Sequence, residues 1–194
     1  MNINERLINY ANRVSEGLES VDKLQLEKIF NLLDSAYHNK TPVYVCGNGG
    51  SFTMSDHFDC DHSKGINYDT SLRPRIEPLT TGSILTAIAN DIGYDQIFSF
   101  QLNNKGDVGN ILVVISASGN SPNIINAIKK AKELGMISIA FVGFDGGEAS
   151  KIADFVLHVK ENNYGIVEDC HQCLMHILAQ QIRMQYNTNN KIKL

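Results

Sequence analysis

Apolar residues recur at two different spacings along the chain, and the change of spacing divides it into two parts. In residues 3–20 and 23–38, Leu, Ile, Tyr, Val and Ala recur at helical intervals with polar residues between them, which predicts two amphipathic helices joined by a short turn. From residue 42 onward, short β-branched runs alternate with helical stretches. The pattern therefore predicts a helical pair followed by a region of alternating strands and helices.

The alternating region predicts a parallel sheet. Strands are expected at PVYVCG, ILVVIS, ISIAFVG and DFVLHV, and helices at 51–63, 122–135, about 146–153 and 166–186. Between them, IEPLTT predicts a further strand, SILTAIAND and YDQIFSFQL predict helices, and the closing NTNNKIKL is expected to fray. ILVVIS is apolar on both sides of its pleat, as a central covered strand should be. We expect a three-layer α/β/α sandwich with a mainly parallel five-stranded sheet and an N-terminal helical extension.

Composition limits the size, partners and compartment of the protein. A chain of 194 residues with 43% apolar content predicts a single structural domain overall, divided into a helical pair at 1–40 and an α/β domain at 41–188. A net charge of -4 without any Lys/Arg run argues against nucleic-acid or membrane partners. Without a signal-peptide or membrane-span pattern, we expect a cytoplasmic protein whose four cysteines are reduced thiols.

Two glycine and serine loops follow predicted strands. VCGNGGS supplies Asn48, Gly49, Gly50 and Ser51, and VVISASGNSPN supplies Ser116, Ser118, Asn120 and Ser121. Such loops present backbone N–H groups to an anion at the positive end of a helix, and Ser51 and Ser121 are expected as N-caps. Each loop alone is equally explained as a tight turn, but two at one sheet edge favour a binding site. Neither loop has Walker A or dinucleotide spacing, and serine hydroxyls without a lysine suit a phosphate monoester better than a nucleoside triphosphate, so we predict a phosphosugar site.

Four motifs together carry a family resemblance. GNGGS...HF...D, AIANDIGYDQIF, GDVGNILVVISASGNSPNIINAIKKAKELGM and VEDCHQCLMHIL resemble the SIS (sugar isomerase) fold. Within that fold they resemble the phosphoheptose isomerases, which convert sedoheptulose 7-phosphate to D-glycero-D-manno-heptose 7-phosphate. The resemblance covers nearly the whole chain. It implies a homotetramer in which the N-terminal helices pack between subunits and active sites lie at subunit interfaces.

The resemblance also assigns roles to particular residues. It implies phosphate-binding serines and further substrate contacts at Ser51, Ser116, Ser118, Ser121, Asn48 and Asp91. It implies metal and acid/base positions at His57, Asp61, Glu168 and His176.

Several positions depart from the family pattern. Asp61 replaces a glutamate, Glu168 replaces a glutamine, and Ala117 stands where many relatives have threonine. The loop ENNYGIVED is shorter than in the better-known enzymes of the family. The relatives also use a basic residue after the first helix of the domain, and Lys64 lies one position away from the matching place. The forms HFDCDHSKG and NNYGIVEDCH resemble a branch associated with surface-polysaccharide heptoses, which leaves the precise sugar open.

Helical spacing supports two of the four metal-binding positions that the resemblance implies. His57 and Asp61, at i and i+4, share a helix face. Glu168 and His176 are eight residues apart, about 80° around a helix, and Asp169 is aligned better with His176, so both acids stay candidates. Two imidazoles and two carboxylates suit Zn2+, with manganese, iron or nickel as alternatives.

The proposed chemistry uses the same side chains. We expect Asp61 to act as base and His176 as acid, with Glu168 as the alternative base. A non-catalytic SIS protein that binds a phosphosugar, or an isomerase of another phosphosugar, are the competing hypotheses. The presence of the His/acid set favours an enzyme.

The other histidines and the cysteine pair have simpler explanations. His62 and His171 are expected to be ordinary helix residues, with His171 able to support a ligand residue, and His38 and His158 to be structural. Cys170 and Cys173 form a Cys-x-x-Cys without a second pair, so we expect core cysteines.

Overall fold

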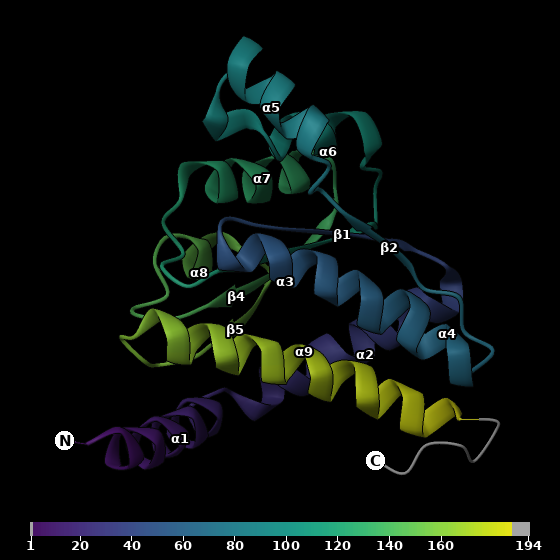
Figure 1. The fold of residues 1–194 in the computed structure, drawn as a ribbon. Coiled ribbons are helices and arrows are strands. Elements are labelled where there is room, and N and C mark those ends of the chain that lie inside the picture. Colours follow the sequence, from purple (N-terminus) through teal and green to yellow (C-terminus); the bar gives the residue numbers. More distant parts are fainter. Residues whose placement is uncertain (1, 188–194) are drawn as a thin grey trace.

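A computed structural model describes residues 2–187 and shows five parallel strands at the centre of the molecule (Figure 1). They are β1 (Pro42–Gly47), β2 (Arg75–Pro78), β3 (Ile111–Ser116), β4 (Ile137–Val142) and β5 (Phe155–His158), in the order β2-β1-β3-β4-β5. Every neighbouring pair is parallel. The predicted α/β sandwich is confirmed, and its sheet is wholly rather than mainly parallel.

The helices follow the predicted pattern closely. They are α1 (Ile3–Glu19), α2 (Lys23–Asn39), α3 (Gly50–Asp59), α4 (Ile66–Asp69), α5 (Gly82–Asp91), α6 (Ser99–Lys105), α7 (Pro122–Glu133), α8 (Ala149–Ile152) and α9 (Tyr164–Tyr186). The helix expected at 51–63 instead ends at Asp59 and continues as a π-helical turn, Cys60–Gly65. A 3₁₀ turn, Tyr94–Gln96, precedes α6. The fraying expected at the C-terminus concerns residues 188–194, which lie outside the described residues.

Side chains from the two sides of the sheet form two separate cores. On β3, Ile111, Val113 and Ile115 pack into a core shared with α2, α3 and α9. Leu112 and Val114 point the other way, into a core shared with α5, α6 and α7. All five side chains are buried, so the prediction of a central strand covered on both faces is confirmed.

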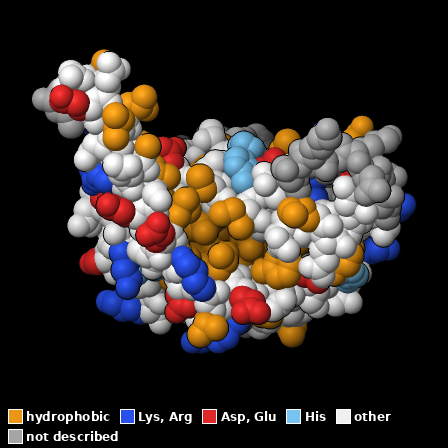
Figure 2. Space-filling model, turned by 90° about the horizontal axis from the view of Figure 1, so that it is seen from below, with side chains coloured by type: hydrophobic (Ala, Val, Ile, Leu, Met, Phe, Trp, Pro, Cys, Tyr) orange, Lys and Arg blue, Asp and Glu red, His pale blue; other side chains and the backbone are white. Residues whose placement is uncertain are grey.

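The N-terminal helices lie on the α9 side of the molecule. Asn2 begins α1 with a capping box, because its side chain accepts from the Asn4 and Glu5 backbone while the Glu5 carboxylate accepts from the Asn2 backbone. Helix α1 packs on α9 and extends beyond the body of the molecule (Figures 1 and 2). Within the described part of the chain, we find no helix with the length and apolar character needed to cross a membrane.

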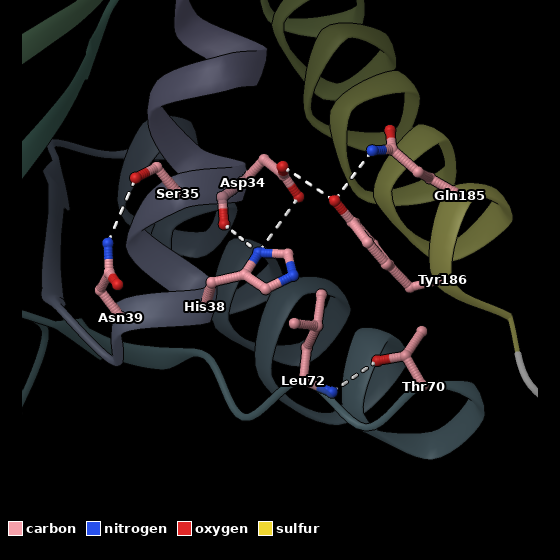
Figure 3. A network of polar contacts seen from close by, with 8 residues as sticks. All are labelled: Asp34, Ser35, His38, Asn39, Thr70, Leu72, Gln185 and Tyr186. Atoms are coloured by element: carbon pink, nitrogen blue, oxygen red, sulfur yellow. Dashed lines mark hydrogen bonds and ion pairs between the residues drawn. The ribbon is translucent and has the colours of Figure 1, made fainter.

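A polar network joins the end of α2 to the end of α9 (Figure 3). The Tyr186 hydroxyl donates to Asp34 Oδ2 at 3.0 Å, and its ring packs edge-on against His38 at 4.8 Å between centroids. His38 Nδ1 lies 2.9 Å from the Asp34 carbonyl oxygen. His38 therefore contributes to the structure, as expected from the sequence.

A buried histidine makes the stability of this fold pH-dependent. His171 is fully buried in α9, with its ring edge-on to Phe141. Burial lowers the pKa of His171 to about 4, from 6.5 for a free imidazole. Between about pH 6.5 and 4 the unfolded chain binds a proton that the folded chain does not, so folding stability falls as the pH is lowered through this window.

In His171→Leu, the free energy of unfolding should fall by about 1.4 kcal/mol less per pH unit than in the wild type as the pH is lowered through that window. Urea unfolding at several pH values measures this slope. The matched control is Asn126→Leu on α7, which introduces the same side chain without removing a titratable group and should keep the wild-type slope. Equal slopes in the wild type and His171→Leu would contradict the assignment.

Candidate active site

The two glycine and serine loops lie side by side at the carboxyl edge of the sheet. Strands β1 and β3 are neighbours, with Gly47 opposite Ile115, so the loops that follow them start next to each other. Between them is a hollow of about 130 Å³. Its polar lining consists of Asn48, Ser51, Ser116, Ser118 and Ser121 from the loops and Tyr164 and Glu168 from α9. The geometry gives a small polar site of the size of a phosphate group, without Lys or Arg in its lining.

The serine hydroxyls are not used as helix caps. Gly49, with a φ of 57°, occupies the N-cap of α3, so the expectation that Ser51 caps this helix is wrong. Ser121 is the N-cap of α7, but its side chain makes no capping hydrogen bond. A glycine in the left-handed region lets the chain turn sharply from β1 into α3, which moves Ser51 into the first turn. Both hydroxyls are consequently left to interact with a ligand.

Glu168 closes one side of the hollow. A side chain at Gly50 would have its Cβ 2.9 Å from both carboxylate oxygens of Glu168, so it would displace this carboxylate from its present place. The neighbouring acid, Asp169, faces the other way and accepts a hydrogen bond from the Tyr10 hydroxyl at 2.7 Å. Of the two acids that the sequence left open, Glu168 is therefore the one at the hollow.

A second cluster lies farther along α3 and α9, which pack against each other. Asp61 Oδ2 lies 3.3 Å from His57 Nε2 and 3.1 Å from His176 Nε2, and the two ring nitrogens are 3.5 Å apart. Gln172, one turn before His176, brings its amide nitrogen to 3.0 Å from the same His176 nitrogen. Sequence reasoning missed Gln172, although its i, i+4 spacing to His176 was a usable signal.

This cluster fits a divalent cation. Ligand atoms at about 2.0–2.1 Å from a tetrahedral zinc ion are about 3.3 Å apart, close to the separations observed here. The donor set is two imidazole nitrogens and one carboxylate oxygen, and all three atoms lie within 4.8 Å of one another. Asp61 Oδ2 is buried and has no hydrogen-bond partner of good geometry, as an oxygen awaiting a cation or proton would.

The fourth expected metal ligand is not in this cluster. Glu168 lines the serine hollow and does not belong to the group of three side chains whose ligand atoms converge. Eight residues along a helix separate Glu168 from His176 by about 12 Å of axial rise, which the two side chains do not close in this conformation. The expectation that Glu168 shares one ion with the other three is therefore not met within the single chain.

Three further candidates are not among the residues that line the hollow. Asp91 is exposed at the end of α5, where its carboxylate accepts from the Asn90 side chain. Asn120 lines an adjacent depression and accepts from the Glu148 backbone at 2.9 Å. Lys64 lies over the Tyr68 ring and borders a wide depression of about 720 Å³ that shares no lining residue with the serine hollow. Asn120 is the nearest of the three, because its depression shares Ser118 and Tyr164 with the hollow.

The remaining histidines and cysteines have structural environments. His62 is fully buried, stacked on Phe58 and 2.6 Å from the Tyr37 hydroxyl, and burial lowers its pKa to about 3. His158 contacts the Phe144 carbonyl oxygen at 3.0 Å. Cys170 is buried and Cys173 partly buried, and both are free. Burial raises the pKa of Cys170 to about 11, which leaves an unreactive thiol.

Comparison with known proteins shows the family to which the chain belongs. A family model described as the SIS domain matches residues 8–143. A phosphoheptose isomerase of Helicobacter pylori (strain P12) is 31% identical over 188 residues, 97% of each chain. One from Clostridium acetobutylicum is 37% identical over 181 residues, 89% of this chain and 92% of that protein. The solved phosphoheptose isomerase of Neisseria gonorrhoeae superposes with a TM-score of 0.85 at 31% identity, over 94% of this chain and 100% of the other.

Proposed function

Because the chain belongs to the SIS-domain family and, within it, to the phosphoheptose isomerases, we propose that it interconverts sedoheptulose 7-phosphate and D-glycero-D-manno-heptose 7-phosphate. It is an aldose–ketose isomerase that works through an enediol(ate). The observation that carries this proposal is that α3 and α9 each contribute to both sites: Ser51 and Glu168 line the serine hollow, and His57 and His176 belong to the cluster that Asp61 completes. One elongated substrate can therefore contact both.

The spacing of the two sites suits a long sugar phosphate. Ser51 and His57 are six residues apart on α3, which corresponds to about 9 Å of helix rise. In a heptose 7-phosphate the phosphate and the reacting carbons, C1 and C2, lie at opposite ends of a seven-carbon chain. Binding energy from the phosphate can then position the reacting end, which is how a remote group contributes to rate.

Proton transfer is assigned to the second cluster. Conversion of the ketose moves a carbon-bound proton from C1 to C2 and a hydroxyl proton from the C1 oxygen to the C2 oxygen, so no external oxidant or reductant is needed. Asp61 is the base for the carbon-bound proton and His176 the acid for the hydroxyl proton, with Glu168 as the alternative base. When bound, a divalent cation polarises the carbonyl and hydroxyl oxygens. His57, Asp61 and His176 would hold it, and their donor set favours Zn2+.

A homotetramer is part of the same proposal. Figure 2 shows apolar side chains gathered on the side of the molecule where α1 and α9 lie. The exposed apolar residues of α1, α2 and α9 include Leu7, Leu24, Ile177 and Met184. A groove of about 200 Å³ between α2 and α9 adds Leu26 and Phe30. This face supports packing of N-terminal helices between subunits. In such an assembly Asp91 would be available to the site of a neighbouring subunit. We infer that the enzyme acts in the cytoplasm, because charged phosphosugars do not cross membranes unaided.

The competing function is a non-catalytic protein that binds a phosphosugar. It requires the serine hollow but not a converging cluster of two imidazoles and a carboxylate, and the cluster therefore favours the isomerase. Incubating purified protein with sedoheptulose 7-phosphate in deuterated water tests this directly by NMR. The isomerase should give aldoheptose phosphate and incorporate deuterium at the carbon next to the carbonyl. Unchanged substrate with bound phosphosugar would support the competing function instead.

Ser118→Ala should raise KM about tenfold with a smaller change in kcat, because the lost hydroxyl contacts the phosphate and not the reacting carbons. Steady-state kinetics with sedoheptulose 7-phosphate would measure both constants. The exposed Ser71 lies outside both loops, so Ser71→Ala is the control and should match the wild type. An unchanged KM in Ser118→Ala would remove this serine from the phosphate site.

A further inference from the structure

Two asparagines from different loops pair face to face at the serine hollow. Asn48 Nδ2 donates to Asn123 Oδ1 at 2.8 Å, and Asn123 Nδ2 donates back to Asn48 Oδ1 at 3.0 Å. The Tyr94 hydroxyl also donates to Asn48 Oδ1, at 3.1 Å. Three segments meet in this way: the loop after β1, the first turn of α7 and the 3₁₀ turn before α6.

These contacts fix which atoms of Asn48 remain free. A carboxamide oxygen has two lone pairs, and both are used here by Asn123 and Tyr94. The amide nitrogen has two hydrogens, and only one is used by Asn123. Asn48 lines the serine hollow, so it can offer a ligand one N–H donor and no acceptor.

We infer that Asn123 is a positioning residue for substrate binding, which orients Asn48 as a donor to an anionic oxygen and holds the two serine loops at a fixed separation. The inference rests on the proposed function for the identity of the ligand, a phosphate monoester. Asn123 itself does not touch the ligand, because its side chain is only 1% exposed and does not line the hollow.

The physical reason is electrostatic. Without Asn123, the Asn48 side chain can rotate and present its carbonyl oxygen to the hollow, where it would repel a phosphate oxygen. The hollow has no Lys or Arg in its lining to offset this repulsion, and the Glu168 carboxylate already lies beside it. Each correctly oriented neutral donor therefore counts for more here than in a site with a fixed positive charge.

Three variants test the inference. Asn123→Leu keeps a similar volume and removes both reciprocal hydrogen bonds. Tyr94→Phe removes only the third hydrogen bond at a position that is 62% exposed, so the fold is not at risk. Asn126→Leu is the matched control, because Asn126 lies one turn farther along α7 and binds the Asp95 backbone and carboxylate outside the hollow.

The dissociation constant of inorganic phosphate is measured by calorimetry, together with kcat, KM and the melting temperature. Asn123→Leu should weaken phosphate binding about tenfold, and Tyr94→Phe about threefold, with KM rising more than kcat falls. Asn126→Leu should keep phosphate binding within about twofold of the wild type, whatever its melting temperature. Equal phosphate binding in Asn123→Leu and Asn126→Leu overturns the inference. If Asn123→Leu does not fold, Asn123→Ser takes its place, because serine also lacks the carboxamide that pairs with Asn48, and wild-type phosphate binding in Asn123→Ser overturns the inference.

Failure of the inference and failure of the proposed function give different results. A wild-type protein that binds phosphate but does not isomerise sedoheptulose 7-phosphate would refute the function, while the variants would still decide the role of Asn123. An active wild type whose phosphate affinity is unchanged in the variants refutes the inference alone. A wild type that binds no inorganic phosphate refutes the inference, while its turnover of sedoheptulose 7-phosphate still decides the function.

Discussion

Asp61→Asn should lower kcat for sedoheptulose 7-phosphate by a factor of about 10³ or more. The amide keeps the shape of the side chain but can neither accept the carbon-bound proton nor neutralise a cation held between His57 and His176. Because the carboxylate is partly exposed, the melting temperature should stay close to that of the wild type. Stopped assays over long incubations would measure the residual rate.

Two further variants show whether this loss is specific. Asp59→Asn changes a neighbouring carboxylate that accepts a hydrogen bond from Ser63, outside both sites, and should keep most of the activity. Glu168→Gln should bind inorganic phosphate more tightly, because a negative charge leaves the serine hollow, and should retain more activity than Asp61→Asn. If Glu168→Gln loses activity and Asp61→Asn keeps it, the base is Glu168 and not Asp61.

His57→Ala and His176→Ala should both lose bound zinc but differ in how far they are rescued. Each change removes one of three converging ligand atoms, so the zinc content of the purified protein should fall in both variants. With excess zinc, His57→Ala should recover to within about tenfold of the wild-type rate. His176→Ala should stay about 10²-fold or more below it, because the acid is also gone.

Zinc content and rescued activity are separate measurements, so each assignment can fail alone. Wild-type zinc content in His57→Ala would remove His57 from the ligand set. Equal rescue of the two variants would leave His176 as a ligand without an acid role. His38 on α2 is not one of the converging ligand residues, so His38→Ala is the control and should match the wild type in both measurements.

The sequence predicted the strands and both serine loops, because these depend on local patterns. ILVVIS is apolar at every position, and the structure buries all six residues of β3. The loops meet because parallel neighbours end at the same edge of the sheet, which follows from strand order alone. The i, i+4 spacing predicts that the His57 and Asp61 side chains lie together. They are in contact in the structure, although the helix becomes π-helical at Cys60.

The sequence could not predict contacts that depend on how distant segments pack. Asn48 and Asn123 are 75 residues apart, and nothing in either loop indicates that their side chains pair. The spacing of Glu168 and His176 also does not show that the two residues belong to different sites. The position of Glu168 at the serine hollow is seen only in its contact with Gly50. The Ser51 cap was predicted from residue type, whereas the positive φ of Gly49 determines where α3 begins.

The central claim is that one substrate spans the serine hollow and the cluster of His57, Asp61 and His176. A crystal structure of the Asp61→Asn variant with sedoheptulose 7-phosphate tests it most directly, because the slow variant preserves the bound ketose. The account predicts phosphate oxygens within about 2.7–3.2 Å of the Ser51, Ser118 and Ser121 hydroxyls, with the C1 and C2 oxygens beside His176. Phosphate bound elsewhere, or a sugar whose C1 and C2 point away from His176, would contradict it.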